Sequence, residues 1–197
     1  ATGSTPAIPP IEGLDGVPFL TNETVFELTA LPRHLIVIGG GPIGAEMAQA
    51  HAQLGCKVTL LEMVAIMAND DPELVEVVRR SLVADGIDLR EGLKVSGVEK
   101  TPTGVAVSVE ADGAVERIEG SHILVAAGRR PNLSGLDLDK AGIEHTPRGI
   151  VVDARLRSRR HERLFVRNSP GALAMLLRRR DIQRSTGRGR VNCSLVK

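Results

Sequence analysis

Apolar and polar positions along the chain predict alternating strands and helices. Residues 35–38 are wholly apolar and predict a strand covered on both faces, and residues 57–62 predict a second strand. Between them we expect a helix over 42–54, with Pro42 in its first turn and Gly55 ending it. The positions expected to pack on the sheet are Ile43, Met47, Ala50 and Leu54.

A second helix is expected after Asp71, which is placed to cap it, with Pro72 at its first position and Gly86 at its end. A short third strand should follow at 87–91. Residues 1–32, rich in Pro, Gly and Thr, are expected to form an extended connector. The inner face of the second helix is predicted to be Leu74, Val77, Val78 and Leu82.

Three runs of alternating pattern come next, at 93–100, 105–110 and 114–119. The middle run is the clearest, with valines at every second position from 105 to 109. Turn signals at 101–104 and 112–113 predict hairpins, so the runs should form an antiparallel meander. A buried strand at 122–128 would then return to the parallel sheet.

The turn after the first predicted strand carries a Gly-x-Gly-x-x-Gly pattern at Gly39, Gly41 and Gly44. The first glycine permits a tight turn, the second lets the backbone approach a pyrophosphate, and the third lets the helix pack closely. The helix start would present unpaired N–H groups to the phosphates. Glu62 follows Gly44 by 18 residues, close to the offset of about 20 expected for the acid that binds ribose hydroxyls.

These patterns together predict a dinucleotide-binding protein of the α/β class. The expected architecture is a Rossmann-like parallel sheet with an antiparallel β-meander in place of one crossover. At 197 residues and 42% hydrophobic content, the chain suits one globular domain with extensions. No apolar run approaches the roughly 18 residues that a bilayer span needs, so no membrane partner is expected.

Charge is divided unevenly along the chain. Residues 1–154 hold 12 Lys or Arg against 22 Asp or Glu, whereas residues 155–197 hold 13 against 2. A boundary near Arg155 is therefore predicted. We expect the basic tail to be non-native, as from a shifted reading frame. The alternative is a tail that binds nucleic acid or acidic membrane, although Phe165 is its only aromatic side chain.

Few side chains suggest catalysis or metal binding. Cys56 and Cys193 lie far apart without a Cys-x-x-Cys or metal-type spacing, and Cys56 is expected to be a small buried thiol. A reducing, cytoplasmic location follows as an expectation. The five histidines are scattered, so we predict no catalytic residue and no metal ligand in this chain.

Four segments, in order and at matching separations, resemble the NAD-binding domain of the pyridine nucleotide–disulfide oxidoreductase family, and within it the dihydrolipoamide dehydrogenase and mercuric reductase branch. The resemblance covers roughly residues 1–157. The segments are ATGSTPAIPPIEGL at 1–14, VIGGGPIGAEMAQAHAQLGCKVTLLE at 37–62, LVAAGRRPN at 124–132 and GIVVDARLR at 149–157.

The resemblance implies an enzyme that passes hydride from NADH to FAD and is a homodimer when intact. It implies a connector from an FAD domain at 1–32, the NAD-binding domain at 33–132, a return segment at 133–156 and a tail outside the family pattern at 157–197. The family's redox cysteine pair and its dimerisation domain are not recognised in this sequence, so the chain alone is expected to be inactive. The electron acceptor is left open among lipoamide, mercuric ion and glutathione.

The resemblance also implies cofactor contacts. Glu62 would hold the adenosine ribose, Val95 would lie beside the adenine, and Gly128 would face the cofactor from the last strand. Glu46 would approach the nicotinamide. The pyrophosphate would be wrapped by Gly39, Gly40, Gly41, Pro42, Ile43 and Gly44. Near the flavin nucleotide would lie Thr2, Gly3 and Ser4.

Plainer interpretations stay open at this point. Val95 is also expected as a core residue, and Glu46 as a solvated helix residue. The chain could instead be a stand-alone NAD-binding module with a basic interaction tail. A methyltransferase also uses a glycine loop followed by an acid, but the meander and the GRRPN segment at 128–132 argue against one.

Overall fold

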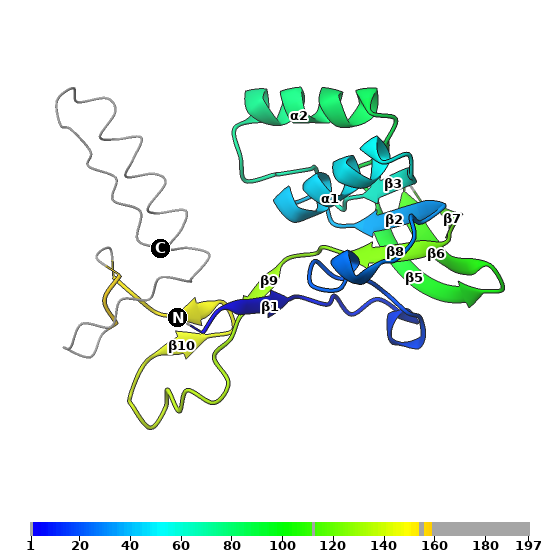
Figure 1. Cartoon of the computed structure of the whole chain (residues 1–197). Helices are drawn as coiled ribbons and strands as arrows, with labels where there is room; N and C mark the ends of the chain where they lie inside the picture. Colours follow the sequence, from blue (N-terminus) through cyan, green and yellow to red (C-terminus); the bar gives the residue numbers. More distant parts are fainter. Residues whose placement is uncertain (1, 112, 154–155, 159–197) are drawn as a thin grey trace. The chain divides into compact units, whose positions relative to one another are not determined.

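The computed structural model describes residues 2–111, 113–153 and 156–158 (Figure 1). Residues 6–129 form one compact unit, and the described residues outside this range belong to a second. The expected basic tail lies outside the described residues, apart from residues 157 and 158. The predicted domain boundaries stay predictions.

The unit at 6–129 is built on a four-stranded parallel sheet in the order β4-β3-β2-β8. Burial on both faces accounts for the continuous apolar sequences of its central strands. The α/β class and the parallel sheet are confirmed, with strand ends within a few residues of those predicted. The strands are β2 (His34–Ile38), β3 (Lys57–Leu61), β4 (Asp88–Arg90) and β8 (His122–Val125).

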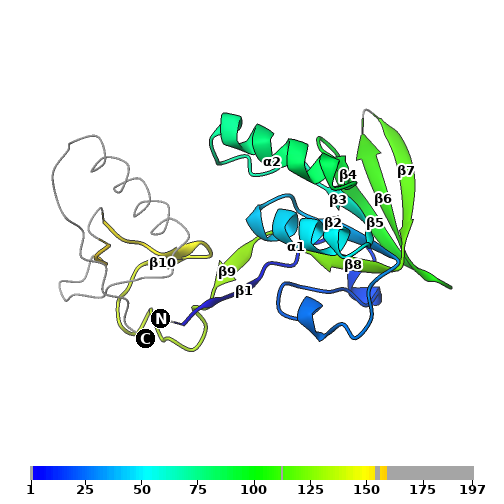
Figure 2. The same ribbon diagram turned by 45° about the horizontal axis from the view of Figure 1, so that its top comes forward.

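Successive residues of the sheet point into two separate cores. On one side Leu35, Val37 and Leu60 pack with α1 (Pro42–Gln53) and α2 (Pro72–Ala84). Figures 1 and 2 show both helices on the same side of the sheet. The other side packs against the meander. Its buried residues include Ile36, Ile38, Leu61, Ile123 and Val125 from the sheet, with Val105, Val107 and Val109 from the meander.

The predicted antiparallel meander is confirmed. Its strands pair in the order β5-β6-β7, with a bulge between Val95 and Gly97. The meander connects β4 to β8, in the position where a helical crossover would otherwise return the chain to the sheet. The strands are β5 (Lys94–Thr101), β6 (Gly104–Ala111) and β7 (Ala114–Gly120).

The predicted inner face of α1 is wrong in part. Ile43 and Met47 are half-buried, but Ala50 is exposed and Leu54 is 70% exposed. The same helical spacing also fits the residues one position later in the sequence than the predicted ones. The small side chains at those positions let the helix approach the strands closely. The buried residues of α1 are Gly44, Ala45 and Ala48.

The predicted inner face of α2 is also corrected, although its start is confirmed. The Asp71 carboxylate accepts a hydrogen bond from the Glu73 amide at 2.9 Å and so caps the helix. The inward stripe is Val75, Val78, Arg79 and Leu82, whereas Leu74 and Val77 are exposed. Because this inward stripe contains an arginine, a search for apolar residues alone does not identify it.

Residues 6–32, expected as a connector, pack within the same unit. Leu14, Val17 and Val25 are buried in its cores. Leu20 lies against β8, where its amide donates to the Ile123 carbonyl at 2.8 Å. Two short 3-10 turns lie in this segment, η1 (Leu14–Gly16) and η2 (Val25–Glu27).

The described residues also form two short pairings of extended chain. The strands β1 (Ser4–Pro6) and β9 (Arg129–Pro131) form one two-stranded sheet. Another is formed by β10 (His145–Thr146) and β11 (Gly149–Ile150), which are antiparallel. Within the described ranges, no helix has the length and apolar character that crossing a membrane would require.

Candidate nucleotide-binding site

The carboxyl ends of β2, β3 and β8 meet at the glycine turn that joins β2 to α1. Gly39 has φ of 108°, a conformation that favours glycine, and a Cβ there would lie 2.6 Å from the Ala126 carbonyl oxygen. The Gly39 amide donates to the Leu61 carbonyl at 2.9 Å, and the Ala126 amide donates to the Ile38 carbonyl at 2.8 Å. The turn is therefore bonded into both neighbouring strands.

The other two glycines of the pattern lie in contrasting surroundings. A Cβ on Gly44 would overlap the carbonyl oxygen of Gly39 and lie 3.0 Å from the carbonyl carbon of that residue. A Cβ on Gly41 would have no heavy atom within 4 Å beyond its chain neighbours and the backbone of its own helix. Gly44 is thus required by helix packing, while the space beside Gly41 is open to a ligand.

The start of α1 faces this open space. Gly41 is the N-cap and has no side chain that could accept a hydrogen bond from the first turn. The first turn also carries no acidic residue, and Pro42 needs no acceptor. The first backbone N–H groups and the partial positive charge of the helix end are therefore available to an anion.

Glu62 lies beside the same turn, directly after β3. Its Oε2 atom accepts a hydrogen bond from the Gly40 amide at 2.6 Å, and its Oε1 atom accepts one from the Val64 amide at 3.1 Å. Each carboxylate oxygen has two acceptor sites, so these bonds orient the group and leave capacity for ribose hydroxyls.

A cavity of about 500 Å³ lies at these strand ends, entirely within the unit at 6–129. Cofactor sites commonly measure about 300–1,000 Å³ and are mostly apolar with a few placed polar groups, as this one is. Seven of the predicted cofactor-binding residues line it. They are Gly39, Gly41, Pro42, Ile43, Glu62, Val95 and Gly128.

The other predicted residues do not line this cavity. Gly40 and Gly44 are buried behind the turn, where they support it, and Glu46 is exposed on α1. Thr2, Gly3 and Ser4 belong to the second unit. There the Gly3 carbonyl accepts a hydrogen bond from the amide of Asn132, and the Thr2 hydroxyl donates to the carbonyl of the same residue.

Several lining residues were missed from the sequence. Ala126 and Ala127 directly follow β8 and precede Gly128, so the rule that ligands bind at the carboxyl ends of parallel strands could have found them. Pro9 and Ile11 carry no local signal, because long-range packing of the N-terminal segment brings them here. The complete set of missed residues is Pro9, Ile11, Ile38, Leu61, Met63, Leu93, Lys94, Ala126 and Ala127.

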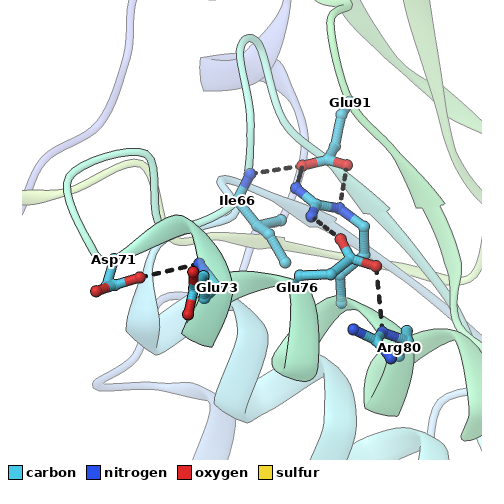
Figure 3. A network of polar contacts seen from close by, with 7 residues as sticks. Ile66, Asp71, Glu73, Glu76, Arg80 and Glu91 are labelled. Carbon is cyan, nitrogen blue, oxygen red and sulfur yellow. Dashed lines mark hydrogen bonds and ion pairs between the residues drawn. The ribbon is translucent and has the colours of Figure 1, made fainter.

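The loop after Glu62 is held by a polar network (Figure 3). The amide of buried Ile66 donates to Glu91 Oε1 at 2.7 Å. Arg79 donates to both oxygens of the Glu91 carboxylate, from Nε at 2.9 Å and from Nη2 at 2.9 Å. The hydrogen bonds from Arg79, reinforced by that from Ile66, lower the pKa of Glu91 from its ordinary value.

Two further titratable groups of the unit at 6–129 are shifted by burial. Cys56 is buried, as predicted, and its burial raises the pKa of the thiol. Burial likewise lowers the pKa of His34, whose Nε2 lies 2.9 Å from the Thr59 hydroxyl. Within residues 2–111, 113–153 and 156–158, no three His, Cys, Asp or Glu side chains are grouped so as to hold a metal ion.

Comparison with known proteins agrees with this geometry. Mercuric reductase from Streptomyces lividans is 36% identical over 159 residues, which cover 80% of this chain and 34% of the relative. Dihydrolipoyl dehydrogenase from Thermus scotoductus is 40% identical over 167 residues, covering 79% of this chain and 35% of the relative. The chain thus spans about a third of the length of these curated relatives.

Two solved structures share the fold. The HOCl-induced flavoprotein disulfide reductase RclA from Escherichia coli, solved as a Cu(II) complex, matches with a TM-score of 0.68 at 31% identity, covering 81% of this chain and 36% of that one. LpdA from Mycobacterium tuberculosis matches with a TM-score of 0.69 at 30% identity, covering 97% of this chain and 43% of that one.

The model of the family described as pyridine nucleotide-disulphide oxidoreductase matches residues 1–167, most of the chain. The match includes the glycine turn, the acid after β3 and the meander that returns to β8. The relatives, the shared fold and this family match agree, and the chain belongs to the pyridine nucleotide-disulphide oxidoreductase family.

Proposed function

We propose that this chain contains the NAD(H)-binding domain of an FAD-dependent oxidoreductase, with NADH held in the cavity at the carboxyl ends of the strands. One observation carries the proposal: the open start of α1 and the oriented carboxylate of Glu62 lie on the same cavity. The first suits a pyrophosphate and the second suits a ribose diol, and a dinucleotide contains both.

The strand order supports one direction for the proposed cofactor. Residues after β3 and at the start of β5 line one end of the cavity, and residues after β8 line the other, with the glycine turn between them. The adenosine would lie on the Glu62 and Val95 end, and the nicotinamide would extend toward Gly128. In this pose the amides near Gly41 hold the phosphates between the two nucleosides.

The dinucleotide supplies hydride to FAD in the intact enzyme, and this chain's own residues bind and orient it. Glu62 fixes the adenosine ribose, and the backbone at Gly41 and Ile43 neutralises phosphate charge through N–H donors. The apolar lining at Ile11 and Val95 excludes water from the cofactor's flat rings. In a flavoprotein that contains this domain, anaerobic NADH should bleach the flavin absorbance, and failure to do so would refute the hydride role.

Glu62 should also make the site prefer NADH to NADPH. A carboxylate that accepts hydrogen bonds from both ribose hydroxyls repels a 2′-phosphate, and residues 63–68 contain no Lys or Arg to bind one. Lys94 also lines the cavity, and its ammonium would attract a 2′-phosphate. The ratio of NADH affinity to NADPH affinity therefore depends on both the Glu62 carboxylate and the Lys94 ammonium.

Isothermal titration calorimetry of the chain with each cofactor tests the assignment. We expect saturable NADH binding and at least about tenfold weaker NADPH binding, equivalent to about 1.4 kcal/mol. Lys94→Ala should widen the gap if its ammonium helps to hold a 2′-phosphate. Equal or tighter NADPH binding would overturn the NADH preference, and binding of neither cofactor would overturn the proposal as a whole.

A further inference from the structure

We infer that the Arg79–Glu91 ion pair is a positioning device for the ribose-binding carboxylate of Glu62. The inference rests on the proposed function and extends it to residues outside the cavity. Neither Arg79 nor Glu91 lines the cavity. Their action would pass through the loop at 62–67, which follows Glu62 directly.

The first step is the contact between Glu91 and the loop. Glu91 Oε1 accepts a hydrogen bond from the Ile66 amide at 2.7 Å, and the Ile66 side chain is fully buried. The loop lies alongside residues 90–93 as well, since the Gly92 amide donates to the Val64 carbonyl at 3.1 Å. The middle of the loop is therefore fixed to the segment that follows β4.

The second step joins the loop to the glycine turn. The Met67 amide, next to Ile66, donates to the Gly40 carbonyl at 2.9 Å. The Gly40 amide in turn donates to Glu62 Oε2 at 2.6 Å. Contacts therefore run without a gap from Glu91, through the loop and Gly40, to the carboxylate proposed to bind ribose.

The third step is the role of Arg79, which holds Glu91 in this orientation. Its guanidinium donates to both Glu91 oxygens, and its Nη1 donates to Glu76 Oε2 at 2.7 Å. The planar guanidinium and two-point contact fix the plane of the Glu91 carboxylate, which a lysine could not do. Figure 3 shows the Ile66 amide reaching the Glu91 carboxylate, with Glu76 nearby on α2.

The position of Arg79 on α2 indicates that the Arg79–Glu91 ion pair does more than anchor the helix. Arg79 lies in the inward stripe with Val75 and Leu82, and its side chain is 29% exposed. Apolar replacement of an inward ion pair is often neutral or stabilising, so helix packing alone does not call for an arginine there. Its directional hydrogen bonds are the property that an apolar residue would lack.

The test compares Arg79→Met with Arg80→Met in the full chain. Arg80 is on the same helix, is 72% exposed and contacts Glu76 but not Glu91, so its loss changes net charge equally. Calorimetry with NADH and NADPH measures affinity, amide hydrogen exchange at Gly40, Ile66 and Met67 measures loop order, and urea unfolding measures global stability.

For Arg79→Met we expect about tenfold weaker NADH binding, the scale of one lost hydrogen bond to a charged group. Exchange at the three amides should be faster while exchange in β2 is unchanged, and NADPH affinity should fall less than NADH affinity. Arg79→Lys should give intermediate values, and Arg80→Met should match wild type within about twofold.

Unchanged NADH affinity in Arg79→Met, or equal losses in Arg80→Met, would overturn the inference while leaving the proposed function intact. Equal losses of NADH and NADPH affinity would also overturn it, because misplacing Glu62 must reduce discrimination between them. A wild-type chain that binds neither cofactor would overturn the proposed function, and the inference with it.

Discussion

Replacing Gly44 by alanine should destabilise the fold and abolish cofactor binding together. The added Cβ would overlap the Gly39 carbonyl oxygen, lie 3.0 Å from the carbon of that group and 3.5 Å from Ala126 Cβ. The start of α1 would have to move by roughly 1–2 Å to restore ordinary carbon contacts. Overpacking of this kind costs about 1–3 kcal/mol, and we expect the upper end because the obstacle is backbone.

Gly41→Ala is the matched control, since it adds the same methyl group three residues earlier. Beyond the chain neighbours and the backbone of the same helix, no heavy atom lies within 4 Å of that methyl, and the φ of −70° at this position suits alanine. Its stability should fall by under about 1 kcal/mol, the effect of alanine at an N-cap. NADH affinity should nevertheless fall steeply, because the methyl occupies space proposed for the pyrophosphate.

Urea unfolding monitored by circular dichroism and calorimetry with NADH separate the two effects. Gly44→Ala should lower the unfolding midpoint with an unchanged slope. Wild-type stability in Gly44→Ala would refute the packing argument. Wild-type NADH affinity in Gly41→Ala would refute the proposed pyrophosphate position.

Three further predictions concern single side chains. Glu62→Ala should weaken NADH binding by about 1–3 kcal/mol without weakening NADPH binding, and calorimetry showing equal losses would contradict this. Because Arg79 lowers the pKa of Glu91 in the folded chain, Glu91 stabilises the fold above its unfolded pKa, near 4.5, and this contribution disappears as pH falls through the lower folded value. The stability gap between wild type and Arg79→Met should therefore shrink in acid, and a pH-independent gap in urea titrations would refute the argument. In a Cys193→Ser variant, Cys56 should react with a thiol reagent only after unfolding, because burial raises its pKa and blocks access; rapid reaction in the native chain would contradict this.

Local chemistry explains what could be predicted from the sequence. The glycine turn, the strands and Asp71 at the start of α2 depend on neighbouring residues, and all were found within a few positions. Which residues of each helix point into the core depends on the segments that pack against that helix. The inward stripe of α1 is made of small residues such as Ala48, and that of α2 contains Arg79. Hydrophobicity alone therefore selected only some of the inward positions, among them Leu82.

Long-range packing determined the remainder of the site. Pro9 and Ile11 reach the cavity because the segment containing Leu20 pairs with β8, more than 100 residues later in the chain. The link from Glu91 to Ile66 spans 25 residues and has no local pattern. Lys94 was visible only as the second residue of the run predicted at 93–100, and its place in the lining of the same cavity as Glu62 depends on the tertiary fold.

The pairing of β2 with β8 has a consequence for how the chain folds. His34 and Ser121, which bond at this junction, are separated by 87 positions, whereas β5, β6 and β7 are joined by tight hairpins. Closing a long loop is entropically unfavourable, but a hairpin meander formed early shortens the effective loop. We therefore expect substitutions in the meander to slow refolding, with β8 joining the sheet late. Refolding kinetics of Val107→Ala, compared with Val125→Ala, would reveal this order, and an unchanged folding rate in Val107→Ala would exclude it.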